Sequence, residues 1–355
     1  MRGGRPNGKL YLFLIGLLTL TGCAELTYYG QAVTGHWQLM SLRRPVAHLL
    51  DDPATPSDLA TRLVTARDLR AFASTELGLP DNGSYRTYAD LKRPYVAWNV
   101  FAAPELSLEL KPWCFPLLGC VTYRGYFDPG AARRLARQLR RQGYDVYVGG
   151  VPAYSTLGWF NDPLLNTFMH WPVSRVAELV FHELAHQRLY IANDTTFNES
   201  FATAVGRLGT GRWLERHAGP DEQEAYREEA RRQASVLNLI GQAREALQQL
   251  YDSRQPVAVK REAKSQILAD LQARYGALRE EWGGDSRFDA WFGQTLNNAQ
   301  LAALTTYTHL VPAFEALFRE VGEDFAAFYR AAEAIGRLPQ ERRAARLETL
   351  AIAGR

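Results

Sequence analysis

The chain has few cysteines and almost no net charge. Its 355 residues include 3 cysteines, too few for a fold built on disulfides. The 41 basic and 38 acidic residues leave a net charge of +3, which argues against a basic nucleic-acid footprint. We therefore expect no nucleic-acid partner. The chain is instead rich in hydrophobic residues, 46% with 12% aromatics, which suits a large packed interior.

The N-terminus has the organisation of an export signal. Three basic residues, Arg2, Arg5 and Lys9, precede the apolar run "LYLFLIGLLTL" at residues 10–20. This run is too short to span a bilayer comfortably and is typical of a signal-peptide core. The protein is therefore expected to leave the cytoplasm.

The four residues Leu20-Thr21-Gly22-Cys23 resemble a bacterial lipoprotein box. The resemblance implies that residues 1–22 are a signal peptide and that Cys23 carries acyl chains. The alternative is a plain anchor helix with an incidental cysteine. Ala24 follows in place of aspartate, so resemblance to Gram-negative sorting signals implies the outer membrane. The body would then remain in the periplasm, held by its lipid anchor.

The other two cysteines, Cys114 and Cys120, lie six residues apart in "WCFPLLGC". Since an exported protein meets an oxidising environment, we predict a disulfide between them. A pair of free buried thiols is the alternative, because so short a loop must still let the two Cβ atoms approach.

Periodicity predicts an α+β fold that is mainly α. Helices are expected over residues 57–79, with Ser57 or Asp58 as N-cap, over 131–144, and over 222–282 as an antiparallel pair. Residues 95–103 and 106–111 are expected to form a strand pair, and residues 144–160 two extended segments separated by a glycine break. We expect one domain over 23–355, comprising an N-terminal part (24–130), a metal-site core (131–215), a helical hairpin (216–290) and C-terminal helices (291–355).

The stretch "ELVFHELAHQRLY" contains two histidines four residues apart. On an α-helix that spacing puts His182 and His186 on one face, where both imidazoles can bind one metal ion. Glu183 then projects beside them and can take a proton from a metal-bound water. The five-residue motif alone is weak evidence, because a polar helix face can contain it by chance.

A third ligand is available thirteen residues after His186. Glu199 stands in "TFNESFATAV", at the start of a second expected helix. Two histidines and a glutamate leave one position open for water or substrate, which is the arrangement of a catalytic rather than a structural zinc. We therefore expect one Zn²⁺ per chain.

The two motifs together resemble those of the gluzincin metallopeptidases, especially zinc aminopeptidases whose second motif reads Asn-Glu-x-x-Ala. The segments "AYSTLGWFNDP", "HELAHQRLY", "DTTFNESFATAV", "GRWL" and "NNAQLAALTTY" resemble a predicted-aminopeptidase family of bacterial envelope lipoproteins. This similarity covers residues 25–340. It implies a zincin-like fold with a small sheet beside the motif helix and a helical C-terminal half.

The resemblance also implies residue roles. His182, His186 and Glu199 would bind zinc, and Glu183 would be the general base and acid. An extended peptide substrate would lie along an edge just before the metal helix. That edge comprises Tyr154, Ser155, Thr156, Leu157, Gly158 and Trp159.

The chain departs from the family pattern at two positions. Thr203 stands where many gluzincins place an aspartate one turn after the glutamate ligand, and Gly206 stands where close relatives are expected to carry an acidic residue. Neither change removes a ligand. Losses in the shell around a metal can nevertheless cost about 10–100-fold in affinity or activity.

Several other side chains have open roles. Tyr307 and His309, with Tyr154 as a further choice, are candidates to stabilise the oxyanion, although each is more simply explained as a packed aromatic residue or a histidine on a helix surface. His170 is best explained as a structural or surface histidine. Two further residues have two alternatives each: Asp194 could hold a ligand imidazole or turn the loop, and Asn198 could orient a ligand or cap a helix. Asp162, Asp194 or another acid could bind the substrate amine.

The favoured reading is a lipid-anchored zinc aminopeptidase acting on peptides in the bacterial envelope. Three alternatives remain open. One is an envelope endopeptidase acting in protein quality control. The others are a catalytically silent binding lipoprotein and a zinc-handling protein, neither of which requires Glu183.

Overall fold

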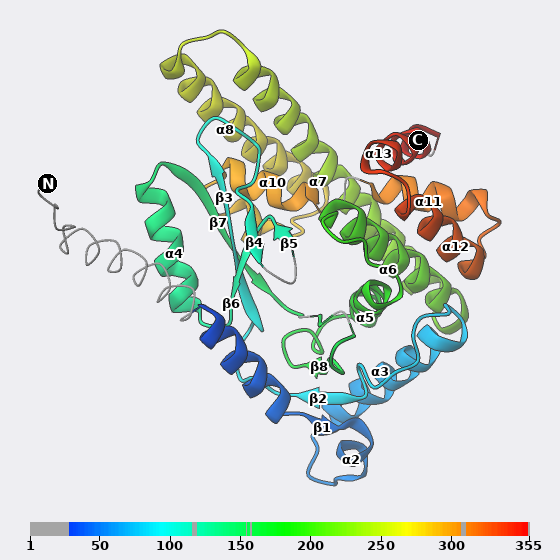
Figure 1. The fold of residues 1–355 in the computed structure, drawn as a ribbon. Helices are drawn as coiled ribbons and strands as arrows, with labels where there is room; N and C mark the ends of the chain where they lie inside the picture. The colour runs from blue at the N-terminus through cyan, green and yellow to red at the C-terminus, as the bar shows by residue number, and fades with distance from the viewer. Residues whose placement is uncertain (1–27, 116–118, 154, 157, 307–309, 354–355) are drawn as a thin grey trace, which may run out of the picture.

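The structure is a computed structural model that describes residues 28–115, 119–153, 155–156, 158–306 and 310–353. Helices dominate it and the sheets are small, so the predicted α+β, mainly α class is confirmed (Figure 1). In these ranges, none of the helices is both long and apolar enough to cross a membrane. In chain order the elements are a helix over residues 28–41, β1 (Arg44–Pro45), α2 (Val46–Asp51), α3 (Ser57–Thr75), β2 (Thr87–Ala89), β3 (Ala97–Pro104), β4 (Trp113–Phe115), β5 (Gly119–Val121), β6 (Arg124–Tyr126), α4 (Pro129–Arg141), β7 (Tyr144–Val151), β8 (Leu164–Leu165), α5 (Val173–Arg188), α6 (Thr195–His217), α7 (Pro220–Asp252), α8 (Val257–Glu281), α9 (Asp289–Phe292), α10 (Asn298–Thr306), α11 (Val311–Glu320), α12 (Phe325–Gly336) and α13 (Gln340–Ala353).

An antiparallel sheet with strand order β6-β3-β7 forms one side of the molecule. Strand β3 pairs with β7 over its whole length, and its residues alternate between two apolar clusters. Val100 and Ala102 pack with α4, whereas Phe101 and Ala103 pack with α10. The sheet is thus covered by one helix on each face (Figure 1).

Two predictions about this sheet are wrong. Residues 106–111 are not a strand. On that edge β3 pairs with β6 only from Trp98 to Val100, and residues 106–111 add a single 2.7 Å hydrogen bond from the backbone N–H of Lys111 to the oxygen of Ala102 in place of a strand ladder. Gly149 and Gly150 do not break the extended segment but lie inside β7. A Cβ at Gly150 would overlap the ring of Tyr95, so the glycine makes room for that ring.

Helices α7 and α8 form the antiparallel hairpin that the sequence predicts, with Pro256 as the N-cap of α8. In Figure 1 this hairpin projects from the top of the molecule. Leu247 and Leu271 are fully buried between its two helices, in an apolar cluster that also includes Phe292 of α9 and Leu301 of α10. The hairpin and these two short helices therefore share a core that is separate from the one around α5 and α6.

The largest core joins α2, α3, α5, α6 and α11–α13 with the strands β2 and β8. Helix α3 begins after Pro56 without a side-chain cap, so the expected cap at Ser57 or Asp58 is wrong. The predicted stop near Gly78 is confirmed, because the chain turns there with φ +62°. Helices α5 and α6 cross near the centre of this core (Figure 1), and they carry the two motifs.

Strands β4 and β5 form a short hairpin in which Cys114 lies opposite Cys120. The two cysteines are joined by a disulfide.

Candidate metal centre

Helix α5 places the two histidines beside the core. Its apolar residues, among them Val180, Phe181 and Leu184, are fully buried and fix the rotation of the helix. That rotation leaves the side chains of His182 and His186 17% and 7% exposed, at the edge of the core. The helix is thus held by its apolar face, and the histidines lie next to that face.

Helix α6 brings the third ligand. Its N-cap is Asp194, whose carboxylate accepts a 3.0 Å hydrogen bond from the backbone of Phe197. Phe197 and Phe201 are fully buried on one side of Glu199. Since the chain returns from α5 to α6 through only residues 189–194, the first turn of α6 lies beside the last turns of α5.

Three side chains converge between these helices. The Nε2 atoms of His182 and His186 lie 3.1 Å apart. Glu199 Oε2 lies 3.4 Å from His182 Nε2 and 3.6 Å from His186 Nε2. Within the described ranges, these three form the one group of histidine, cysteine and acidic side chains arranged closely enough to hold a metal ion.

The spacing suits a bound zinc. In a tetrahedral site with bonds of about 2.0–2.2 Å, two ligand atoms lie about 3.3–3.5 Å apart. The three separations of 3.1, 3.4 and 3.6 Å bracket that value. Two imidazole nitrogens that face each other at 3.1 Å also require a cation or a shared proton between them. The donor set therefore fits a cation in both geometry and chemistry.

Electrostatics at the group favours an anion beside protonated or metal-bound imidazoles. Burial raises the pKa of Glu199, but the charge of His186 and hydrogen bonds from both histidines outweigh burial and leave this pKa well below its usual range. Burial lowers the pKa of His182, but the hydrogen bond that its imidazole donates to Glu199 and the nearby carboxylates outweigh burial and leave this pKa raised. Glu199 is therefore charged at neutral pH, ready to bind a cation.

Thr203 and Gly206, the two positions where the resemblance implies acidic residues, have clear structural settings. The Thr203 hydroxyl lies 3.4 Å from His182 Nδ1, where its oxygen can accept a hydrogen bond from the imidazole N–H and so fix the tautomer. A Cβ at Gly206 would lie 2.7 Å from the backbone oxygen of Glu178. Gly206 therefore lets α6 approach α5 more closely than any other residue would.

Glu178 supplies a carboxylate near the ligands. It lies one turn before His182 on α5, accepts a 3.3 Å hydrogen bond from the Tyr226 hydroxyl, and faces Arg207 at 3.8 Å. Its charge contributes to the raised pKa of His182. The side chain of Glu178 is 29% exposed, yet desolvation still raises its own pKa above the usual value.

The predicted base, Glu183, is half-buried on α5. Its charge acts on Tyr85, whose hydroxyl has no hydrogen-bond partner among the described residues and whose side chain is 2% exposed. Burial, followed by the charges of Glu183 and Asp162, raises the pKa of Tyr85 well above its usual value. Tyr85 also has φ +63°, a strained conformation for a non-glycine residue.

A buried polar network holds Tyr85 in place. The backbone N–H of Tyr85 donates to the carbonyl oxygen of Asp162 at 2.6 Å, and the guanidinium of Arg70 donates to the carbonyl of Ser84 at 2.9 Å. Gln187, directly after the second histidine, donates to the Ser84 hydroxyl at 3.3 Å. Sequence reasoning missed this network. Its signal was Arg70, a charged residue on the apolar face of α3 that is only 2% exposed.

The structure assigns Asp194 and Asn198 to the loop between the helices. Asp194 caps α6 with one oxygen and accepts from Arg343 with the other at 2.8 Å, so it does not hold a ligand imidazole. The amide of Asn198 accepts from the backbone N–H of Ile191 at 2.7 Å and donates to its carbonyl at 2.8 Å. Asn198 is thus neither the helix cap nor, through these bonds, a partner of the metal ligands.

The two aspartates considered for the substrate amine are also occupied. Asp162 is 1% exposed, and its oxygens accept from the backbone and hydroxyl of Thr156 at 3.0 and 2.9 Å. Both oxygens of Asp194 are bonded as described above. Neither carboxylate is therefore placed to receive an ammonium group from solvent.

Part of the predicted substrate edge can be located. Thr156 is fixed by Asp162, and a Cβ at Gly158 would lie 3.7 Å from Gln187, so this loop runs beside the metal helix. Ser155 is half-buried in the same loop. Five other predicted positions lie outside the described residues, namely Cys23, Tyr154, Leu157, Tyr307 and His309.

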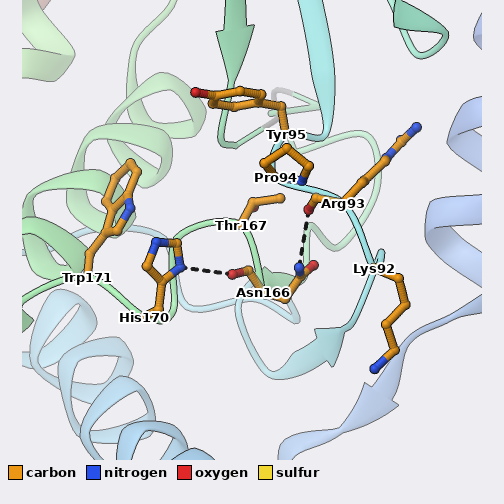
Figure 2. A pocket seen from close by; sticks show the side chains of 8 residues that line it. All are labelled: Lys92, Arg93, Pro94, Tyr95, Asn166, Thr167, His170 and Trp171. Carbon is orange, nitrogen blue, oxygen red and sulfur yellow. Dashed lines mark hydrogen bonds between the residues drawn. The ribbon is translucent and has the colours of Figure 1, made fainter. Parts of the chain in front are cut away.

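A separate open pocket of about 540 Å³ contains none of the predicted site residues (Figure 2). It is lined by residues 92–95, 166–167 and 170–171. His170 Nδ1 donates to the backbone oxygen of Asn166 at 3.1 Å, in keeping with a structural or surface histidine. This pocket and the metal-ligand group are therefore different places.

Comparison with known proteins gives a family but no close relative. No curated protein and no solved structure matches the chain. Residues 27–347 match the model of the family described as "Putative aminopeptidase", which covers both motifs and nearly the whole described chain. The chain therefore belongs to this aminopeptidase family.

Proposed function

We propose that the protein is a zinc-dependent aminopeptidase that removes N-terminal residues from peptides in the bacterial envelope. The observation that supports this most is the convergence of His182, His186 and Glu199, with ligand atoms 3.1–3.6 Å apart. Family membership supports a peptidase that trims amino termini. Zinc is the metal that best suits two imidazoles and one carboxylate with an open fourth position.

The residues divide the work of hydrolysis. When bound, zinc supplies Lewis-acid chemistry that lowers the pKa of water and polarises a carbonyl. His182, His186 and Glu199 hold the ion. Thr203 contacts Nδ1 of His182, and the charge of Glu178 raises the pKa of that imidazole. A carboxylate oxygen of Glu183 takes the proton of the attacking water and delivers it to the leaving amine nitrogen, so the amine departs neutral.

Substrate contacts complete the proposal. The loop of Ser155, Thr156 and Gly158 presents backbone beside the metal helix, which suits an extended peptide. Tyr307 and His309 follow α10 in the chain and are proposed to donate a hydrogen bond to the developing oxyanion.

The compartment belongs to the same proposal. Residues 1–22 are proposed to be removed and Cys23 lipidated, which would anchor the protein to the outer membrane on the periplasmic side. The disulfide between Cys114 and Cys120 supports an oxidising compartment of this kind.

The test combines metal analysis with cleavage of matched peptides that have free or blocked amino termini. We expect one zinc per chain and cleavage of free termini only. Glu183→Gln should retain the zinc and lose the cleavage, because it removes the base and keeps the ligands. Glu215→Gln, which removes an exposed carboxylate from α6, is the control and should behave as wild type.

Each other result has a definite meaning. Cleavage of blocked peptides would move the assignment to an endopeptidase. Zinc binding without any cleavage would favour a binding lipoprotein. A chain that binds no zinc would remove the basis of the whole proposal.

A further inference from the structure

The surface next to the proposed lipid anchor has unusually exposed aromatic side chains. Trp159 is 85% exposed and Trp37 is 74% exposed, the two highest values among the large hydrophobic residues described. Val33, at 69%, and Phe160, at 52%, accompany them. Large apolar groups exposed together mark a surface that contacts something other than water.

These residues come from two segments that touch. The imidazole of His36 lies 4.7 Å from the ring of Phe160, measured between ring centroids. Arg43 donates a 3.0 Å hydrogen bond to the backbone oxygen of Asn161. The loop after Gly158 is therefore held against the helix of residues 28–41, and the two segments share one surface.

The helix of residues 28–41 has a second apolar face. Its inner side packs on the body through Leu39, which is 1% exposed, and Gly35, where a Cβ would overlap the ring of Phe127. Tyr29, Val33 and Trp37 are spaced four residues apart, so they form one stripe, and all three are exposed. Figure 1 shows this helix in dark blue at the outside of the molecule.

The helix also lacks the charges that a water-facing helix normally carries. From Leu26 to Leu42 the sequence contains no lysine, arginine, aspartate or glutamate, and Arg43 and Arg44 follow directly. Helices exposed to water usually have charged residues opposite the core. An uncharged apolar stripe ending in two arginines suits the boundary between acyl chains and headgroups.

We propose that this surface, formed by Tyr29, Val33, Trp37, Trp159 and Phe160, docks on the phospholipid bilayer that holds the anchor. The proposal rests on the lipidation of Cys23. Only residues 24–27 separate Cys23 from the start of the helix at residue 28, which limits the distance between the two to at most about 18 Å. A lipid at Cys23 therefore keeps the helix at the membrane, where tryptophan and tyrosine are the favoured side chains.

Docking would place the catalytic group near the bilayer. The loop that carries Trp159 and Phe160 runs past Gln187, the residue after the second histidine. Its substrate edge would then open close to the headgroups. Peptides held at the membrane surface are the substrate class that this orientation favours.

The test uses fluorescence of the full chain purified from bacterial membranes. The protein is reconstituted into phosphatidylethanolamine–phosphatidylglycerol vesicles with brominated acyl chains, which quench tryptophans at the membrane boundary. Of the eight tryptophans, the six other than Trp37 and Trp159 are buried or half-buried. We expect quenching and a blue shift in the wild type, partial loss in Trp37→Ser and in Trp159→Ser, and complete loss in the double variant.

Two variants serve as controls. Val257→Ser with Val259→Ser removes exposed apolar side chains from α8 and should leave the quenching unchanged. Trp37→Ser should cleave soluble peptides at the wild-type rate, which shows that it folds.

The outcomes separate this proposal from the proposed function. Absence of quenching at every lipid concentration overturns the docking surface, whether or not Cys23 carries lipid. If the purified chain carries no lipid at Cys23 and its tryptophans are still quenched, the docking surface is supported and only the proposed lipid anchor is overturned. Two other results would also overturn the docking, because each assigns the surface to another occupant. One is a dimer that buries both tryptophans in solution. The other is Trp159→Ser with a raised KM for soluble peptides and unchanged quenching.

Discussion

Replacing Gly206 by alanine tests whether close approach of α5 and α6 sets the metal site. The new Cβ would lie 2.7 Å from the backbone oxygen of Glu178, about 0.7 Å short of the 3.4 Å at which ordinary contact begins. That oxygen is a backbone atom, so it cannot rotate away and the helices must separate. Metal-ligand distances tolerate about 0.2 Å. Separation of α6 from α5 would carry Glu199 away from His182 and His186.

Two effects are expected in the Gly206→Ala protein. Overpacking should lower the free energy of unfolding by about 1–3 kcal/mol, partly offset by up to about 1 kcal/mol from the better helix propensity of alanine. The affinity for zinc should fall by about tenfold or more, as for other changes in residues that position the metal ligands without binding the metal. Competition with a chromophoric chelator measures the affinity, and denaturant unfolding of the metal-free protein measures the stability.

The same helix offers two matched controls. A Cβ at Gly209 would meet the side chains of Leu77 and Phe181, so Gly209→Ala should cost stability with a smaller effect on zinc. A Cβ at Gly211 would meet nothing within 4 Å, so Gly211→Ala should gain about 0.5–1 kcal/mol and bind zinc normally. If Gly206→Ala binds zinc as tightly as Gly211→Ala, the reasoning about helix approach is refuted.

Three further predictions concern the surroundings of the site. Thr203→Val removes the hydroxyl that lies 3.4 Å from His182 Nδ1, and it should weaken zinc binding about tenfold without unfolding the protein. Titration calorimetry measures this affinity, and an unchanged value would show that the hydroxyl does not act on the imidazole. Asn198→Ala removes both hydrogen bonds to Ile191 and should cost about 1–3 kcal/mol in denaturant unfolding; a smaller loss would mean that the loop is held elsewhere. Burial raises the pKa of Asp162 from 3.8 to about 6, so the folded state binds the proton of this carboxyl group more tightly than the unfolded state does. The free energy of unfolding should therefore fall by up to about 3 kcal/mol as pH rises from 4 to above 6. Asp162→Asn should lack this contribution, and an identical pH dependence in both proteins would contradict the assignment.

The ligand set could be predicted because its geometry is local. His182 and His186 are one helical turn apart, and Glu199 follows after one short loop, so helix periodicity alone brings them close. The helical hairpin could be predicted for the same reason, since α7 and α8 each have a long apolar stripe and meet at Pro256.

The polar network around the base could not be predicted in this way. Tyr85 and Asp162 lie far from Glu183 in the chain and meet it only through tertiary packing. No periodic pattern marks such a contact. Likewise, Asp194 is a plausible ligand partner in sequence, but its second oxygen pairs with Arg343, a residue of the last helix. Side-chain roles that depend on distant partners require the fold.

Thr203 and Gly206 are linked through their contacts with α5. An acidic side chain at position 206 would need space that the backbone of Glu178 already occupies, whereas glycine leaves it free. Negative charge still reaches His182, because Glu178 supplies it from one turn earlier on α5, while Thr203 contacts His182 Nδ1 without carrying a charge. The close approach at Gly206 and the carboxylate at Glu178 are thus complementary features of one helix contact. Replacing Gly206 by an acidic residue alone should therefore weaken the site, since the new side chain would separate the helices that hold the three ligands together.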